Sequence, residues 1–232
     1  MASPLTEAHI GAQKRLRDAL TAIIATAWRD LPAYDRADIP AFLDTAVPAV
    51  LAAQRQSVAL TEAYIARYLG RRPVGIAPAA LIGAGIRGTD PAEVYARPFV
   101  TVWTALSEGV PYESAVSAGL SRATEMAAFD VQASMRATSG AVQSATPEGF
   151  YGYQRVANGD ACDYCAEIDG AYVKFADAMP LHPNCGCGLE PLTAPHPRAA
   201  KLPSGVSVHE HGEMGAIIAD PAHAFTGPSG LN

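Results

Sequence analysis

All four cysteines of this chain, together with one histidine, fall within the segment 162–187. Cys162 and Cys165 are separated by two residues, and His182, Cys185 and Cys187 follow after a longer interval. Cysteine and histidine ligands grouped as two short pairs, joined by about 15–20 residues, are typical of a structural zinc site. Because the ligands of such a site must converge on one ion, the cluster dictates where the chain turns back on itself.

A structural zinc ion takes four ligands, and this segment offers five candidates. The two-residue spacing lets Cys162 and Cys165 point at one centre from a tight turn, so they form the first pair. The second pair comes from His182, Cys185 and Cys187, and the sequence leaves open which two of the three bind. We expect a structural zinc ion held by four of these five side chains.

Two other states of the cysteines compete with a metal site, namely disulfides and unliganded thiols packed in a core. The N-terminus lacks the basic region and the apolar run of a secretion signal, which indicates synthesis in the cytosol. Disulfides are rare in a reducing compartment, where clustered cysteines are more often metal ligands. We therefore expect a metal, and zinc in particular, because thiolate-rich tetrahedral sites favour it.

A catalytic zinc differs from this pattern, since it keeps three protein ligands and an open position beside an acid or base. Zinc deaminases carry His-x-Glu upstream of Pro-Cys-x-x-Cys. Here His211-Gly-Glu213 lies downstream, and no proline precedes Cys162. The surplus of ligands and the wrong order predict a structural site, with no catalytic residues.

The charge of the chain limits its partners. The formal net charge is −6, and residues 151–232 carry 4 Lys+Arg against 9 Asp+Glu, whereas residues 1–150 carry 13 against 14. Proteins that bind phosphate backbones are usually basic, so broad nucleic-acid binding is disfavoured. Four carboxylates near the cysteines predict a solvated acidic rim or a docking face for a basic partner: Asp160, Asp163, Glu167 and Asp169.

Periodic apolar residues predict a bundle of helices over residues 1–140. Ser3 can cap the first helix, and Pro4 fits its first position. The apolar residues that recur at helical spacing in this helix are Leu16, Leu20, Ile23, Ile24 and Trp28. No apolar run reaches the length of about 18–20 residues that a membrane span needs, so no membrane contact is expected.

Prolines and glycines predict the limits of the later helices. Pro48 and Pro98 each predict an end or a kink, because proline lacks an amide proton and clashes within a helix. A long amphipathic pattern over 112–138 is expected to close at Gly140. The Gly-x-Gly-x-x-Gly pattern at 83–88 lacks a preceding strand, and the next helix is expected only after its third glycine, so we interpret it as a loop.

Beyond residue 140 the pattern changes from helical to extended. Aromatic and β-branched residues predict short strands at 150–156 and 171–175, on either side of the first cysteine pair. We expect an α+β fold, mainly α, in three parts. These are a helical region (1–140), a small β module stapled by the Cys/His metal site (141–194), and an extended C-terminal tail (195–232) with two short strands at most, near 206–208 and 216–218.

The order of residues around the cysteines resembles a known signature. In chain order the segment carries Arg155, the Cys162/Cys165 pair, a predicted strand at 170–173, the string Leu181-His-Pro-Asn-Cys-Gly-Cys187, and Leu189 with Pro191. This order resembles the C-terminal signature of the Mu F-like minor head proteins, the head-morphogenesis proteins of tailed bacteriophages. The helical N-terminal region and the alanine- and arginine-rich usage are similar in character to such proteins from phages of actinobacteria.

The resemblance implies a minor capsid protein, present in low copy inside the virion and associated with the portal. It implies a role in head assembly, and in DNA packaging or ejection, after synthesis in the cytoplasm of a bacterial host. The expected partners are the portal protein and the major capsid or scaffolding protein, with packaged DNA nearby. Relatives often carry arginine where this chain has Gly186, so the resemblance gives no support for a DNA contact through this loop.

Two further functions remain as alternatives to a structural protein. A zinc-dependent hydrolase or deaminase acting on nucleic acid would need an open metal position and an adjacent carboxylate such as Asp160 or Glu167. A zinc-ribbon reader of nucleic acid would bind in a salt-sensitive manner, against which the negative charge of residues 151–232 already argues.

Overall fold

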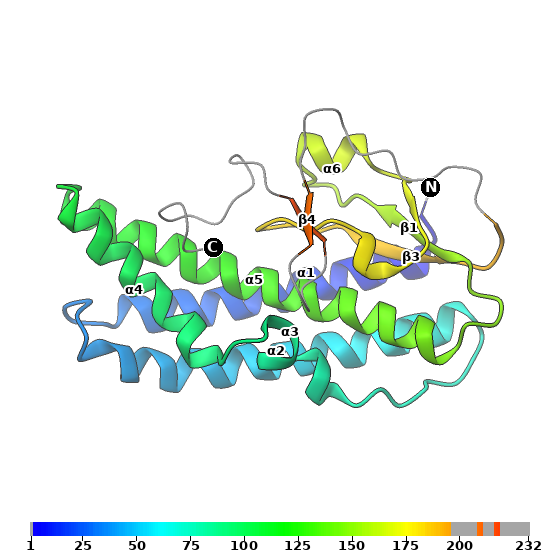
Figure 1. The fold of residues 1–232 in the computed structure, drawn as a ribbon, viewed down its shortest axis with the longest axis horizontal. Helices are drawn as coiled ribbons and strands as arrows, with labels where there is room; N and C mark the ends of the chain where they lie inside the picture. The colour runs from blue at the N-terminus through cyan, green and yellow to red at the C-terminus, as the bar shows by residue number, and fades with distance from the viewer. Residues whose placement is uncertain (1, 196–207, 211–215, 219–232) are drawn as a thin grey trace.

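Four long helices run side by side along the length of the molecule (Figure 1). The computed structural model describes residues 2–195, 208–210 and 216–218. The long helices are α1 (Pro4–Arg29), α2 (Asp38–Tyr68), α4 (Pro91–Ser107) and α5 (Tyr112–Ala145). A small sheet packs at one end of this bundle (Figure 1), which confirms the expected mainly helical α+β fold.

The starts of the helices follow local capping chemistry. The Ser3 side chain accepts a hydrogen bond from the Thr6 amide, and Pro4 occupies the first position of α1, as predicted. At the start of α4 the Asp90 side chain accepts from the Ala92 amide in the same way. In both caps a side-chain oxygen accepts a hydrogen bond from a first-turn amide, which has no carbonyl partner within the helix.

Of the end or kink predicted at Pro48 and Pro98, the end is wrong, because α2 and α4 both continue through their prolines. Phe42, Ala46 and Val50 lie on both sides of Pro48 at four-residue spacing, and all three are buried in one core. Packing of both halves on the same core outweighs the cost of an internal proline, about 3 kcal/mol.

Two other expected boundaries also differ. Helix α5 continues past Gly140 to Ala145, because the β module covers its last turns and buries Val142. Within the glycine pattern at 83–88 a short helix, α3 (Ala84–Arg87), begins after the first glycine rather than after the third. A 3-10 turn, η1 (Pro78–Leu81), precedes it, so the strand that dinucleotide binding requires is absent from this described segment.

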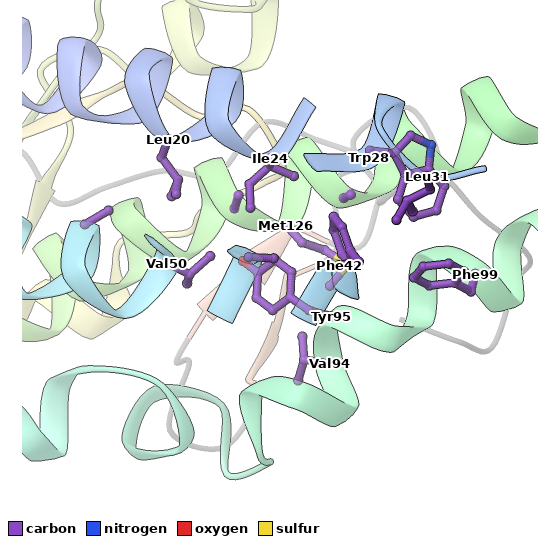
Figure 2. Packing of buried hydrophobic residues seen from close by; sticks show 14 of the residues in the cluster. Leu20, Ile24, Trp28, Leu31, Phe42, Val50, Val94, Tyr95, Phe99 and Met126 are labelled. Atoms are coloured by element: carbon purple, nitrogen blue, oxygen red, sulfur yellow. The ribbon is translucent and has the colours of Figure 1, made fainter. Parts of the chain in front are cut away.

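An aromatic core joins the helices away from the sheet. Trp28 packs beside Phe42 and Phe99 (Figure 2), with its ring centroid 5.4 Å from that of Phe42 and 5.0 Å from that of Phe99. Its indole nitrogen donates a hydrogen bond to the Val116 carbonyl. A side chain at Gly119 would place its Cβ 2.5 Å from the Trp28 ring. The glycine therefore lets α5 approach the indole closely.

The sheet has three antiparallel strands in the order β2-β1-β3. They are β1 (Gly152–Val156), β2 (Tyr172–Val173) and β3 (Gly188–Leu192). The first two confirm the predicted strands in shortened form. Strand β3 was not predicted, because Pro191 within it argues against a central strand, and it is accommodated at the edge.

The C-terminal tail is described only in part. Strands β4 (Val208–Glu210) and β5 (Ala216–Ile218) pair with each other, which agrees with the predicted strand at 216–218 and moves the other to 208–210. The rest of the predicted tail, including His211 and Glu213, lies outside the described residues. None of the described helices has the length and apolar character that crossing a bilayer requires.

Candidate metal centre

Two tight turns bring the five candidate ligands together. Cys162 is the N-cap residue of the short helix α6 (Asp163–Glu167), and Cys165 lies within that helix, which places the pair on one turn. His182 and Cys185 form a second turn just before β3, closed by a hydrogen bond of 3.0 Å from the Cys185 amide to the His182 carbonyl. In this turn Asn184 adopts a positive φ of 62°, a conformation that asparagine tolerates better than most residues.

The ligand atoms form two groups of three that share Cys165. One group is Cys162, Cys165 and His182, and the other is Cys165, Cys185 and Cys187. Within each group all ligand atoms lie within 4.8 Å of one another. All four cysteines are free thiols, so the disulfide alternative is not what the structure contains. The five predicted residues therefore converge into a cluster that can hold a metal ion.

The His182 imidazole is oriented as a ligand would be. Its Nδ1 lies 2.7 Å from the Pro183 carbonyl and donates to it, which leaves the lone pair on Nε2. Nε2 lies 3.0 Å from the Cys165 sulfur and 3.4 Å from the Cys162 sulfur. Neighbouring ligand atoms of a tetrahedral zinc ion are about 3.5 Å apart, so these separations fit one ion.

A buried arginine provides the countercharge of the cluster. Arg155 is only 1% exposed, and its guanidinium donates to the sulfurs of Cys165 at 3.0 Å and Cys185 at 3.3 Å. Burial alone lowers the pKa of Arg155, but the adjacent thiolates of Cys185, Cys187 and Cys165 outweigh burial and raise it. A permanent cation at this position stabilises thiolates inside the protein.

A polar chain connects the ligand turn to the helices, and no sequence motif indicated it. Arg17 of α1 donates to the Gln132 side chain of α5 at 2.8 Å, and Gln132 donates to the carbonyl of Cys187. A Cβ at Gly186 would lie 2.5 Å from the Asn158 side-chain nitrogen and 3.0 Å from an Arg17 nitrogen. The only sequence signal for Arg17 and Gln132 was that each is a long polar side chain on a helix face that is otherwise buried.

The predicted acidic residues are partly brought together at a cavity of about 490 Å³ between α1 and the β module. Its lining includes four carboxylates: Glu7, Asp160, Asp169 and Glu190. The described residues that line it include Arg155 but none of the five candidate ligands, and neither Asp163 nor Glu167. The cavity is therefore adjacent to the metal cluster but is not an opening onto it.

A second buried network attaches strand β3 to helices α1 and α2. The Tyr64 hydroxyl donates to the Leu189 carbonyl at 3.2 Å and lies 2.7 Å from the Thr6 hydroxyl, which in turn donates to Glu190. The His9 ring stacks on Tyr64 with centroids 4.3 Å apart and planes within 4°. Its Nε2 is buried without a hydrogen-bond partner, and burial lowers the pKa of His9 to about 4.

This histidine predicts a loss of stability in mild acid. The pKa of His9 is lower in the folded protein than the value of 6.5 in the unfolded chain, so the unfolded chain takes up the proton first as the pH falls. The contribution of neutral His9 to the free energy of unfolding is therefore fully present above pH 6.5 and is lost as the pH falls towards 4. Between about pH 7 and pH 5 we expect His9 alone to remove about 2 kcal/mol from the free energy of unfolding. Urea titrations of the wild type and of His9→Phe, which keeps a flat ring against Tyr64, measure this difference.

The two proteins share every other titrating group, so subtracting their pH profiles isolates His9. A His9→Phe variant that loses stability with the same pH slope as the wild type would contradict the assignment.

The fold and the site together define a mainly helical α+β protein with a buried Cys/His cluster in its small sheet module. Comparisons with protein-family models, with curated proteins and with solved structures found no match. The donor set fits a metal ion of the softer kind, since four thiol sulfurs and one imidazole nitrogen supply every candidate ligand.

Proposed function

We propose that the cluster binds one structural zinc ion and that the protein is a non-catalytic assembly component. The observation that carries this proposal is the burial of Cys165, Cys185, Cys187 and His182, all no more than 6% exposed, around a cationic Arg155. Four of the five candidate ligands are enclosed in this way and Cys162 is of intermediate burial, which favours a structural ion over one that meets a substrate. An ion held there joins α6 to the turn before strand β3 and adds to the apolar contacts of Tyr164, Ile168 and Leu189.

The surroundings of the cluster also argue against the alternative of a zinc-dependent hydrolase or deaminase. Such an enzyme needs a water ligand that faces a substrate cavity and a carboxylate that can move a proton. Asp160 lines the cavity between α1 and the β module, but none of the candidate ligands lines it. The negative charge of residues 151–232 likewise gives no support to a zinc-ribbon reader of nucleic acid.

For the biological setting we propose a minor head protein of a tailed bacteriophage, located inside the capsid near the portal. The support is the resemblance of the residues from Arg155 to Pro191, together with a body of four long helices that offers long surfaces to other head components. The portal protein and the major capsid or scaffolding protein are the proposed partners. The acidic cavity walls favour a basic surface on the partner over a direct contact with packaged DNA.

Two measurements test this proposal. Elemental analysis of the purified protein is expected to give one zinc per chain, and a zinc-free protein with an unchanged melting profile would contradict the structural role. Cryo-EM of intact virions is expected to place the chain beside the portal. Density for this chain on the outer capsid surface, or its absence from virions, would contradict the proposed setting while leaving the zinc site intact.

A further inference from the structure

The strand β5 (Ala216–Ile218) lies against the segment that leads into the ligand turn. Ile217 forms a parallel bridge with Leu181, and the Leu181 amide donates to the Ala216 carbonyl at 3.1 Å. Leu181 is the residue before the candidate ligand His182. A strand from the C-terminal part of the chain is therefore hydrogen-bonded directly beside the metal cluster.

A buried arginine of α5 fastens the same strand. Arg136 is 3% exposed, and its Nη1 donates to the Ala216 carbonyl at 2.6 Å and to the Met179 carbonyl at 2.7 Å. One cationic nitrogen thus joins β5 to the residues just ahead of the ligand turn. Because hydrogen bonds from a charged donor are stronger than neutral ones, the Ala216 carbonyl anchors β5 at this point.

The apolar contact of β5 is made by Ile217 with the residues that surround the cysteine ligands. Ile217 is half-buried and packs on a group of buried residues that includes Cys165, Cys185 and Cys187. Among the described residues, every other member of that group lies between residues 86 and 187. Ile217 therefore adds a cover to the cluster from a segment that follows the whole module in sequence.

The attachment of β5 is small compared with that of the elements it covers. β4 and β5 pair with each other over three residues, and a two-stranded ribbon of this size is not stable by itself. Segments with few buried apolar contacts open locally at a much lower free energy than the whole fold. β5 can therefore lift from the cluster while the long helices and the three-stranded sheet stay folded.

We propose that β5 is a strap that closes over the metal cluster, and that zinc enters and leaves when this strap lifts. The proposal rests on the proposed zinc site, but it holds whichever four of the five candidate side chains bind the ion. It gives the C-terminal part of the chain a function in retaining the metal. Bound zinc should accordingly exchange slowly in the intact chain.

Replacing the isoleucine of the strap tests this role in the intact, zinc-loaded chain. Ile217→Lys is expected to keep one zinc per chain and to speed zinc transfer to a chromogenic chelator by about 10-fold, because a half-buried apolar side chain no longer packs. Ile217→Ala should raise the rate by less. The matched control is Ile23→Lys, on the surface of α1, where the side chain is 46% exposed and the wild-type rate is expected.

Amide exchange at Leu181 reports lifting of the strap separately from zinc release, because this amide donates to the Ala216 carbonyl. Both rates are expected to rise together in Ile217→Lys. Faster exchange at Leu181 with unchanged zinc release would overturn the strap as the route and indicate exit past Cys162, which is only partly buried.

Two further results would also overturn the strap and leave the zinc site standing. These are unchanged rates in both Ile217 variants, and an equal acceleration of zinc release in Ile23→Lys. A wild type that takes up no zinc would instead overturn the proposed function itself, and the role of the strap with it.

Discussion

Replacing Cys165 by serine is expected to abolish binding of the proposed zinc ion and to unfold the sheet module while the long helices stay folded. Its sulfur belongs to both groups of candidate ligands, and among the described residues no group of three ligand atoms within 4.8 Å of one another lacks it. Binding of a structural zinc ion contributes about 10–16 kcal/mol in small zinc-dependent modules, which exceeds the stability of a typical domain. The sheet itself is small, and its other attachments include the apolar packing of Tyr153, Val173 and Leu189 against α2 and α5.

The helices are expected to survive because their core does not depend on the module. Trp28, Phe42 and Phe99 pack with one another in a cluster that contains no residue of the sheet (Figure 2). Most of the far-UV circular dichroism should therefore persist in Cys165→Ser.

Amide hydrogen exchange followed by mass spectrometry measures this directly. Segment 152–192 should lose its protection in Cys165→Ser, whereas α1 and α4 should keep theirs. Treating the wild type with a chelator should give the same pattern, and adding zinc back should reverse it in the wild type alone. Undiminished protection of segment 152–192 in a zinc-free variant would show that packing, not a metal, holds the module.

Replacing Asp130 by alanine is expected to destabilise the protein by about 3–5 kcal/mol, because it leaves a buried guanidinium without its partner. Asp130 lies 2.6 Å from the Nε of Arg87 and accepts a hydrogen bond of 2.8 Å from the Tyr95 hydroxyl. The side chains of Arg87 and Asp130 are 9% and 3% exposed. This pair fixes the short helix α3 (Ala84–Arg87) on the long helix α5.

The chain contains a matched control for this measurement. Lys14 and Asp18 form an ion pair of 2.9 Å on the surface of α1, with side chains 48% and 61% exposed. Asp18→Ala is expected to change the free energy of unfolding by less than about 1 kcal/mol, since solvent screens such pairs. Guanidinium chloride denaturation of both variants gives the comparison.

The double variant Arg87→Met/Asp130→Leu separates the lost ion pair from the lost volume. It should recover much of the loss, because apolar side chains replace a buried pair without leaving a charge behind. A cost of similar size for Asp130→Ala and Asp18→Ala would contradict the importance assigned to burial.

The ligand cluster was the feature most accessible to sequence reasoning. Metal ligands must be of a few types and close together, and here they are also close along the chain, so Cys162, Cys165, His182, Cys185 and Cys187 could all be named from spacing alone. The helix start at Ser3 was equally local, because a cap depends on the next two or three residues only.

The predicted helix ends at the prolines were wrong because they depend on tertiary packing rather than on local sequence. A proline is a local signal, but whether a helix continues through it depends on what its two halves bury, and α2 buries both on one core around Phe42 and Val50. Strand β3 was missed because Pro191 is tolerated only at a sheet edge, and strand order is a tertiary property.

What the sequence by itself determined is therefore the chemistry of the site and the class of the fold, since residue type, spacing and periodicity carry both. The tertiary structure decided how the site is completed. Arg155 comes to the sulfurs through the pairing of β1 with its neighbours, and Gln132 and Arg17 reach the ligand turn from two helices far away in sequence. Such partners share no local pattern, because only the packing of distant segments brings a countercharge to a buried cluster.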